Sequence, residues 1–389
     1  PYKVLGVNPE LVVYNGMNVK EPLSINEKAK QEKKNYLLKI CSSFLGETLP
    51  ANTQIWISSG RYEFRNKGYD LTIDALAKLK DKLKDKCPPI LMLFLVAADN
   101  QKLVNYDLPK SSDPNFREVA ISPVYNKEHD CIVNSCKHFG LDHKDSPVRV
   151  IFSSLYLDGE DGIFNISYEE ILELCDLSLF PSFYEPWGYT PLESAVTGVP
   201  TITSDLAGFG YWTQISDEDW SSLVKVLNRK NKSYDEAARD LAEMMESYCL
   251  STPDKEKILA TTNKMRAQID WSQIYNGYKT AYDIAMGKAY ERVLVSKGLY
   301  TKNSFSSTRC HIQPGRPALR SMALEANLPE KLCKLNEIAY NIWWAWNDDA
   351  QDLFRSLSPD LWEYFDHNPV KLLKSIPFTE FEELQNNPA

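Results

Sequence analysis

The chain of 389 residues is too long for one ordinary domain, and its 43% of apolar and 25% of charged residues are typical of a soluble globular protein. Its net charge of −9 offers no basic footprint for nucleic acid, and no apolar run approaches the roughly 18 residues that a membrane span needs. The eight cysteines are scattered without a CxxC pair, and no signal peptide is recognisable. We therefore expect reduced thiols and a cytoplasmic protein that binds neither nucleic acid nor membrane.

Apolar runs that predict strands alternate with amphipathic helices through residue 204. The predicted strands are 11–15, 55–59, 90–96, 148–152, 177–181 and 201–204, and the predicted helices between them include 25–45, 69–83 and 126–139. This alternation favours an α/β fold with a mostly parallel, doubly wound sheet of the Rossmann type. A glycine-bearing loop at 207–210 then leads to further predicted helices at 217–228, 234–248, 253–269 and 272–292.

A glycine-bearing loop with cationic residues follows the predicted strand 55–59. It reads GRYEFRNKG, contains Arg61 and Lys67, and leads directly into the helix 69–83. A strand end that feeds a helix start is a ready anion site, because the first N–H groups of a helix have no partners within it. A lone Arg or Lys in a loop is usually a solvated surface charge, so this motif needs support from a second one.

The stretch 180–212, FPSFYEPWGYTPLESAVTGVPTITSDLAGFGYW, repeats the design of a strand end that feeds a helix start. The strand 177–181 ends in a turn, and a helix is predicted to begin at Thr190, with Glu185 and Glu193 on either side of that place. Thr190 and Glu193 also match a plain capping box, so Glu193 has a purely structural alternative. Glu185 lies in the turn and has no comparable structural explanation.

Together the two motifs resemble those of retaining GT-B glycosyltransferases. YEPWGYTPLE is similar to the signature of glycogen synthases of the animal and fungal type, and GRYEFRNKG is similar to the matching loop of the same enzymes. The resemblance implies the C-terminal, nucleotide-sugar-binding domain of a GT-B fold. It also implies transfer of glucose from UDP-glucose to the non-reducing end of an α-1,4-glucan with retention. It implies neither a metal nor a cofactor in this part of the chain.

Carried over residue by residue, the resemblance assigns a donor site to eight positions. Those in catalytic roles are Arg61, Lys67 and Glu185, and those in substrate-binding roles are Tyr168, Gly188, Tyr189, Thr190 and Glu193. The resemblance implies that the two cations hold the diphosphate, with help from the backbone amides near residues 188–190. Glu185 would hold sugar hydroxyls and face the charge that develops at the anomeric carbon.

The remaining two assignments concern the nucleoside. By the resemblance, Glu193 would hold the ribose hydroxyls and Tyr168 would lie against the uracil ring. Tyr168 follows Ser167, which with Glu170 forms a predicted capping box at the start of a helix. An aromatic residue at a helix start is otherwise a packing residue, and this alternative stays open for Tyr168.

The chain also departs from the family pattern. The family's first domain, which binds the glucan acceptor and supplies a catalytic His, is expected before Pro1, so we expect this chain to be inactive alone. Residues 254–271 contain the single arginine Arg266 where the family carries a cluster for glucose 6-phosphate, which makes that regulation doubtful. Asp217-Glu218-Asp219 matches a metal-binding acid-x-acid pattern but is better interpreted as an acidic first helical turn, without metal.

The last part of the chain differs in texture. Residues 296–317 contain four basic residues and no acidic one, which indicates a linker, and 318–389 resemble the first helices of bacterial α-glucan phosphorylases. We therefore divide the chain into a nucleotide-sugar-binding domain (1–295), a linker (296–317) and an α-helical segment (318–389). The pyridoxal-phosphate site of such a phosphorylase would lie downstream. The alternatives are a non-catalytic nucleotide- or glucan-binding regulatory module and a fragment of an α-glucan phosphorylase.

Overall fold

The computed structural model describes residues 9, 11–19, 21–23, 25–83, 87–99, 113–122, 124 and 127–296. The chain divides into two units, one of Met17–Asp270 and one of Pro1–Gly16 with Trp271–Ala389. The predicted linker beyond Ser296 and the helices expected in 318–389 lie outside the described residues, so this division of the chain stays a prediction. Within the described part, no helix is long and apolar enough to cross a bilayer.

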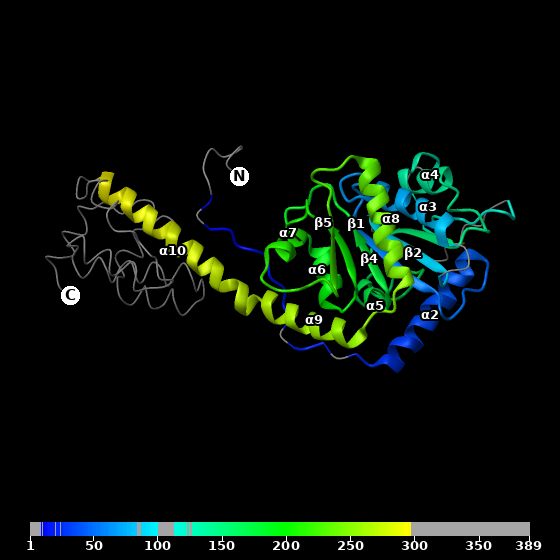
Figure 1. The fold of residues 1–389 in the computed structure, drawn as a ribbon, viewed down its shortest axis with the longest axis horizontal. Coiled ribbons are helices and arrows are strands. Elements are labelled where there is room, and N and C mark those ends of the chain that lie inside the picture. Colours follow the sequence, from blue (N-terminus) through cyan, green and yellow to red (C-terminus); the bar gives the residue numbers. More distant parts are fainter. Residues whose placement is uncertain are drawn as a thin grey trace. The chain divides into compact units, whose positions relative to one another are not determined.

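The unit Met17–Asp270 is built on one six-stranded sheet (Figure 1). Its strands are β1 (Gln54–Arg61), β2 (Ile90–Asp99), β3 (Val148–Leu155), β4 (Leu177–Phe180), β5 (Thr201–Ser204) and β6 (Val224–Leu227). They lie in the order β3-β2-β1-β4-β5-β6, and neighbouring strands are parallel throughout. The predicted doubly wound α/β fold is confirmed. The strand order reverses at β1, which has β2 on one side and β4 on the other.

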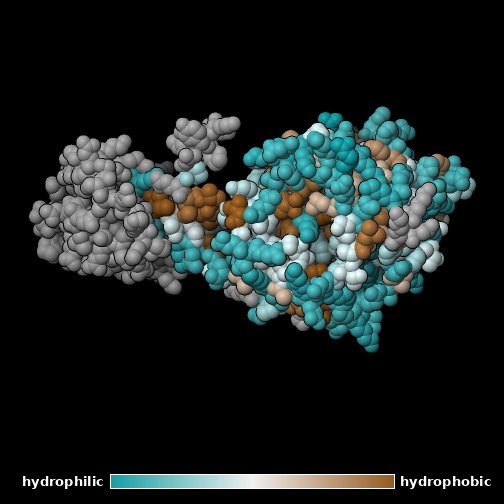
Figure 2. Space-filling view, in the orientation of Figure 1, coloured by the Kyte–Doolittle hydropathy of each residue, from teal (hydrophilic) through white to brown (hydrophobic). Residues whose placement is uncertain are grey.

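Helices connect these strands and cover the sheet. In the same unit they are α2 (Glu27–Leu45), α3 (Tyr69–Leu83), the short 3-10 helix η1 (Lys127–His129), α4 (Cys131–His138), α5 (Tyr168–Leu174), α6 (Tyr189–Val196), α7 (Gly208–Ile215), α8 (Tyr234–Leu250) and α9 (Lys255–Ile269). The other unit contains α10 (Trp271–Ser296). The face of the unit Met17–Asp270 seen in Figure 2 is mostly hydrophilic, with small separate apolar areas.

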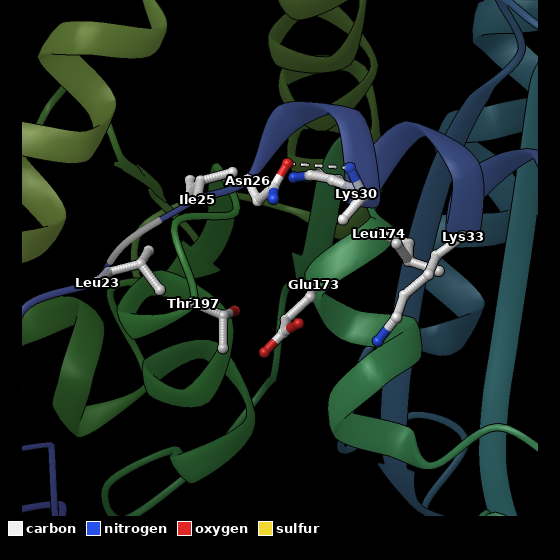
Figure 3. Close-up of a pocket in the computed structure, with 9 residues that line it drawn as sticks. Leu23, Ile25, Asn26, Lys30, Lys33, Glu173, Leu174 and Thr197 are labelled. Carbon is white, nitrogen blue, oxygen red and sulfur yellow. Dashed lines mark hydrogen bonds between the residues drawn. The ribbon is translucent and has the colours of Figure 1, made fainter.

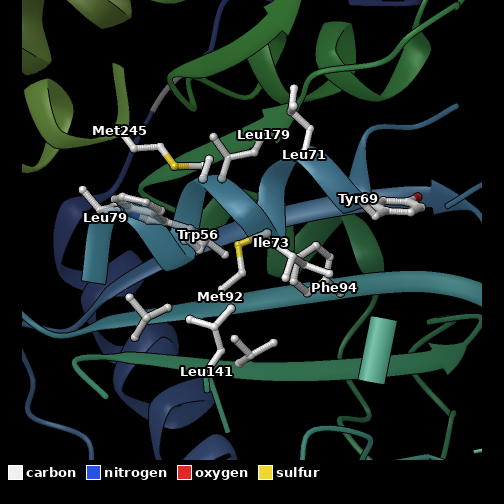
Figure 4. Close-up of a cluster of buried hydrophobic side chains, with 14 of the residues drawn as sticks. Trp56, Tyr69, Leu71, Ile73, Leu79, Met92, Phe94, Leu141, Leu179 and Met245 are labelled. Carbon is white, nitrogen blue, oxygen red and sulfur yellow. The ribbon is translucent and has the colours of Figure 1, made fainter. Parts of the chain in front are cut away.

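The alternation of side chains along the strands creates an apolar core on each face of the sheet. On one face, Trp56 of β1 and Phe94 of β2 pack with α3, α4 and α8 (Figure 4). On the other face, Ile55 and Ile57 of β1 pack with α2 and α5. Because both faces are covered, the central strands are apolar almost without interruption, which explains why the sequence pattern locates them well.

Several predicted elements are wrong. The stretch 217–228 is not a helix: it contains bends and then the short edge strand β6, whose Val224 and Leu227 are buried while Lys225 is exposed. Residues 11–15 form no strand, and the helix expected at 126–139 is split into η1 and α4, with Asp130 as the N-cap of α4. In the bend that replaces the predicted helix start, Glu218 is paired with Lys264.

The expected glycine loop at 207–210 is instead the start of helix α7. A Cβ atom at Gly208 would lie 2.2 Å from the carbonyl oxygen of Pro186, and one at Gly210 would lie 2.1 Å from that of Ser204. These glycines therefore allow a helix to pack against two backbone segments, and they do not mark a flexible loop.

Candidate functional site

Two loops lie together at the carboxyl ends of β1 and β4, which are neighbours in the sheet. The β1–α3 loop and the β4–α6 loop are joined by the backbone N–H of Phe183, which donates to the carbonyl of Asn66 at 2.7 Å. Gly68 has a φ of +74°, and a Cβ there would lie 2.2 Å from the carbonyl oxygen of Pro181. In open α/β sheets, ligands bind in the crevice where the strand order reverses, and these loops border that place.

Lys67 and Glu185 form an ion pair between the two loops. Their side chains are 11% and 17% exposed, so most of the pair is removed from water. The backbone of Glu185 is held by the segment between β5 and α7. Its N–H donates to the carbonyl of Leu206 at 3.3 Å, and its carbonyl accepts from the N–H of Gly208, the first residue of α7, at 3.0 Å. The structure therefore brings together the two expected site residues that are 118 positions apart in the chain.

Arg61, the last residue of β1, lies in the same loop but is oriented differently. Its side chain is 80% exposed, and its Nε lies 3.4 Å from the carboxylate of Glu63. A pair of this length at the surface contributes little to stability. The backbone of Arg61 is fixed, since its carbonyl accepts from the hydroxyl of Tyr69 at 3.2 Å. The backbone of Arg61 is therefore fixed, but its guanidinium is exposed and is not part of the Lys67–Glu185 ion pair.

Helix α6 begins at Tyr189, and Gly188 is its N-cap with a φ of 106° and no side-chain cap bond. The capping-box interpretation of Thr190 and Glu193 is therefore wrong, because Thr190 already lies inside the helix. The amides of residues 188–190 belong to a helix start, where N–H groups have no acceptor within the helix. Glu193 is half-buried and lies within α6, where it does not cap the helix.

Tyr168 is the first residue of α5, which has the predicted capping box of Ser167 and Glu170. The hydroxyl of Tyr168 lies 2.9 Å from that of Ser59 on β1, and its side chain packs against the core on the α2–α5 face. Burial raises the pKa of Tyr168, and the nearby charge of Glu193 adds to the rise. The bond to Ser59 places the Tyr168 hydroxyl beside β1, and the contacts of its ring with the core give Tyr168 a packing role.

Two residues at this edge of the sheet were missed in the sequence. Tyr69 is fully buried, and burial together with the neighbouring Tyr168 raises the pKa of its hydroxyl. Arg229 follows β6, donates to the carbonyl of Pro181, and lies 5.3 Å from the ring centroid of Phe183. Arg229 follows the carboxyl end of β6. Because a helix is predicted over that segment, nothing in the sequence pattern places Arg229 at the edge of the sheet where ligands bind.

Two cavities of the described residues lie away from these loops. One of about 160 Å³ lies between the start of α2 and the ends of α5 and α6 (Figure 3). It is bordered by Leu23, Ile25, Asn26, Ala29, Lys30, Lys33, Glu173, Leu174 and Thr197. The ends of α5 and α6 precede β4 and β5, so this cavity is at the opposite edge of the sheet from the two loops. It contains none of the expected site residues.

We expect Glu193→Gln to stabilise the protein at neutral pH. Burial raises the pKa of the Glu193 carboxyl above its ordinary value of 4.5, and the charge of Glu169 raises it further. The folded state therefore binds this proton more tightly than the unfolded chain, and ionising Glu193 costs stability as the pH rises above 4.5. Urea unfolding at pH 7 and pH 4 would measure this: the gain should be present at pH 7 and shrink on acidification. An equal gain at both values would contradict it.

Sequence comparisons identify relatives of both parts of the chain. A family model described as glycogen synthase matches residues 95–336, and one described as a protein of unknown function (DUF3417) matches 328–389. Glycogen [starch] synthase isoform 1 of Saccharomyces cerevisiae is 27% identical over 367 residues, which cover 74% of this chain and 52% of the relative. The liver glycogen [starch] synthase of Homo sapiens is 24% identical over 345 residues, covering 72% and 49%.

The chain spans about half the length of the curated relatives it matches. Among solved structures, the lipopolysaccharide glycosyltransferase WaaG aligns with a TM-score of 0.41 and 15% identity, covering 73% of this chain and 58% of that one. Anabaena HepE in complex with UDP aligns with a TM-score of 0.41 and 14% identity, covering 71% and 57%. Because the glycogen synthase model matches more than half of its residues, this chain belongs to the glycogen synthase family.

Proposed function

We propose that this chain is the donor-binding half of a glycosyltransferase that moves glucose from UDP-glucose to the non-reducing end of an α-1,4-glucan, with retention of configuration. The observation that carries the proposal is the meeting of Lys67 and Glu185 at the point where the strand order reverses. Both residues come from the two motifs that resemble the glycogen synthases, and family membership supports the same activity.

In the proposed reaction the bond between the anomeric carbon and the diphosphate oxygen breaks, and a bond to an acceptor hydroxyl oxygen forms on the same face of the sugar. The proton of that hydroxyl passes to the departing diphosphate. Lys67, Arg61 and the amides at the start of α6 would stabilise the negative charge that grows on the leaving diphosphate. The exposed guanidinium of Arg61 can turn toward a phosphate without breaking a buried contact. Glu185 would hold sugar hydroxyls and face the positive charge at the anomeric carbon.

The nucleoside would lie beside the end of β1. Glu193, which is half-buried on helix α6, would accept hydrogen bonds from the ribose hydroxyls. Tyr168 would offer its ring to the uracil while its hydroxyl stays bonded to Ser59. Placing a ribose hydroxyl against Glu193 would also offset part of the cost of burying that carboxylate.

The acceptor side of the reaction is proposed to come from a first domain not contained in this chain. That domain would bind the glucan and supply the catalytic His, so we expect the chain alone to transfer little glucose. Residues 318–389 are proposed to be the first helices of an α-glucan phosphorylase-like region, and the parent protein to be a cytoplasmic fusion of the two activities. Steady incorporation of glucose into glycogen by this chain alone would contradict the need for a first domain.

Calorimetric titration with UDP and, separately, with ADP tests the donor site. We expect UDP to bind and ADP not to bind, and Arg61→Ala to weaken UDP binding by about tenfold or more, because a hydrogen bond to a charged group is lost. Arg65→Ala is a matched control, since Arg65 is an exposed cation in the same loop. An equal loss in both variants would indicate a general charge effect, and binding of neither nucleotide by the wild-type chain would contradict the proposed donor site.

A further inference from the structure

We propose that Glu185 competes with the donor diphosphate for Lys67, and that this competition weakens UDP once the glucosyl group has left. The inference rests on the proposed function, in which Lys67 holds the diphosphate and Glu185 holds the sugar. It adds a role in product release, because the residue assigned to the diphosphate and the residue assigned to the sugar form an ion pair with each other.

The ion pair is well placed to act as a competitor. Its two side chains are only 11% and 17% exposed, so each is shielded from the water that would otherwise replace its partner. The backbones are fixed as well, by the hydrogen bond between Asn66 and Phe183 and by the bonds of Glu185 to the following loop. Lys67 and Glu185 therefore return to the same contact whenever nothing lies between them.

The charges around the crevice make this exchange necessary. The β1–α3 loop contributes the exposed Arg61 and Arg65 and the shielded Lys67, and the carboxylates of Glu63 and Glu185 pair with Arg61 and Lys67. With Lys67 neutralised by Glu185, the loop leaves a diphosphate the exposed guanidinium groups of Arg61, which is itself beside Glu63, and of Arg65. A diphosphate gains the ammonium of Lys67 only by displacing Glu185 or by sharing the ammonium with it.

The complete donor and the product meet this competition differently. UDP-glucose brings a phosphate to Lys67 and hydroxyls to Glu185, so both members of the broken pair receive new partners. UDP brings only the phosphate and leaves Glu185 as a shielded carboxylate without a partner, which is costly. Glu185 is therefore expected to favour binding of the full donor and to expel UDP by taking Lys67 back.

Calorimetric titration of the whole chain with UDP tests the exchange. Glu185→Gln should bind UDP about tenfold more tightly than the wild-type chain, because Lys67 is released, and this corresponds to about 1.4 kcal/mol. Glu63→Gln is the matched control: it removes a negative charge from the same loop and frees the exposed Arg61, while its amide oxygen can still accept from the Asn66 side chain, so UDP affinity should change much less. In a Lys67→Met background, Glu185→Gln should bring no gain.

The outcomes distinguish failure of the proposed competition for Lys67 from failure of the proposed donor site. UDP affinity that is unchanged or lower in Glu185→Gln would overturn the inference while leaving the donor site intact. A gain of equal size in Glu63→Gln, or one that persists in the Lys67→Met background, would overturn it too, because the effect would then be general repulsion. Failure of the wild-type chain and of Glu185→Gln to bind UDP at all would instead contradict the proposed function.

Discussion

Replacing Gly68 by alanine is expected to lower the free energy of unfolding by roughly 3 kcal/mol or more. The new Cβ would lie 2.2 Å from the carbonyl oxygen of Pro181, and the residue would keep a φ of +74° that side chains rarely adopt. Neither the segment of Gly68 nor that of Pro181 can move easily, because α3 packs against the sheet and β4 is one of its strands. Urea unfolding monitored by circular dichroism measures the loss.

Gly46→Ala is the matched control for this prediction. Gly46 ends helix α2 with a φ of +65°, but a Cβ there would meet nothing within 4 Å. It should therefore cost only the backbone strain, about 1–2 kcal/mol. If the two variants lose the same stability, the contact with Pro181 has no weight, and the close approach of the two loops is not what fixes Gly68.

Arg117→Met is expected to destabilise the protein by about 3 kcal/mol or more, because two buried carbonyls lose their donor and the carboxylate of Glu47 loses Arg117 while retaining Arg149 at 3.2 Å. The Arg117 side chain is 1% exposed and its Nε lies 2.7 Å from the carboxylate of Glu47. It also donates to the carbonyls of His143 and Lys144. Thermal or urea unfolding would measure the loss. Lys255→Met is the control, since its pair with Glu27 is 75% and 58% exposed and should contribute little.

The same variant should change how stability depends on pH. Burial alone would raise the pKa of Glu47, but hydrogen bonds and charges from Arg117 and Arg149 outweigh burial and lower it below 4.5. The stabilisation by Glu47 is therefore complete above pH 4.5 and is lost as the pH falls through its pKa in the folded protein. Arg117→Met should flatten this loss, and an unchanged acid profile would contradict the assignment to Glu47.

How far the fold is predictable depends on burial. The predicted helix 69–83 coincides with α3, and the predicted strand 201–204 coincides with β5, because their apolar patterns are strong and their ends carry clear signals. The segment 217–228 was misassigned since β6 is a four-residue edge strand with an exposed lysine, which leaves too little alternation to distinguish it from a helix. Pairing order along the sheet is a long-range property that local patterns do not contain.

The candidate site was also predictable in part, for a reason that concerns the geometry of parallel strands. Carboxyl ends of parallel strands share one edge, so Lys67 and Glu185 could be expected on the same side, and the structure pairs them. The exposure of Arg61, the shielding of Lys67 and the tight packing of Gly68 against Pro181 are tertiary features that local sequence patterns do not contain. The sequence pattern suggests a capping role for Glu193 because it places the N-cap at Thr190, two residues after the observed N-cap Gly188.

The reversal of strand order has a consequence for how the protein matures. Lys67 and Glu185 are 118 positions apart, so the crevice cannot form until β1 and β4 have paired across all of the intervening chain. Nucleotide binding should therefore appear late in folding, together with the last cooperative step. A nucleotide held between the two loops would add its binding free energy to the native state alone. UDP should therefore stabilise completely folded molecules and leave incompletely folded ones unaffected.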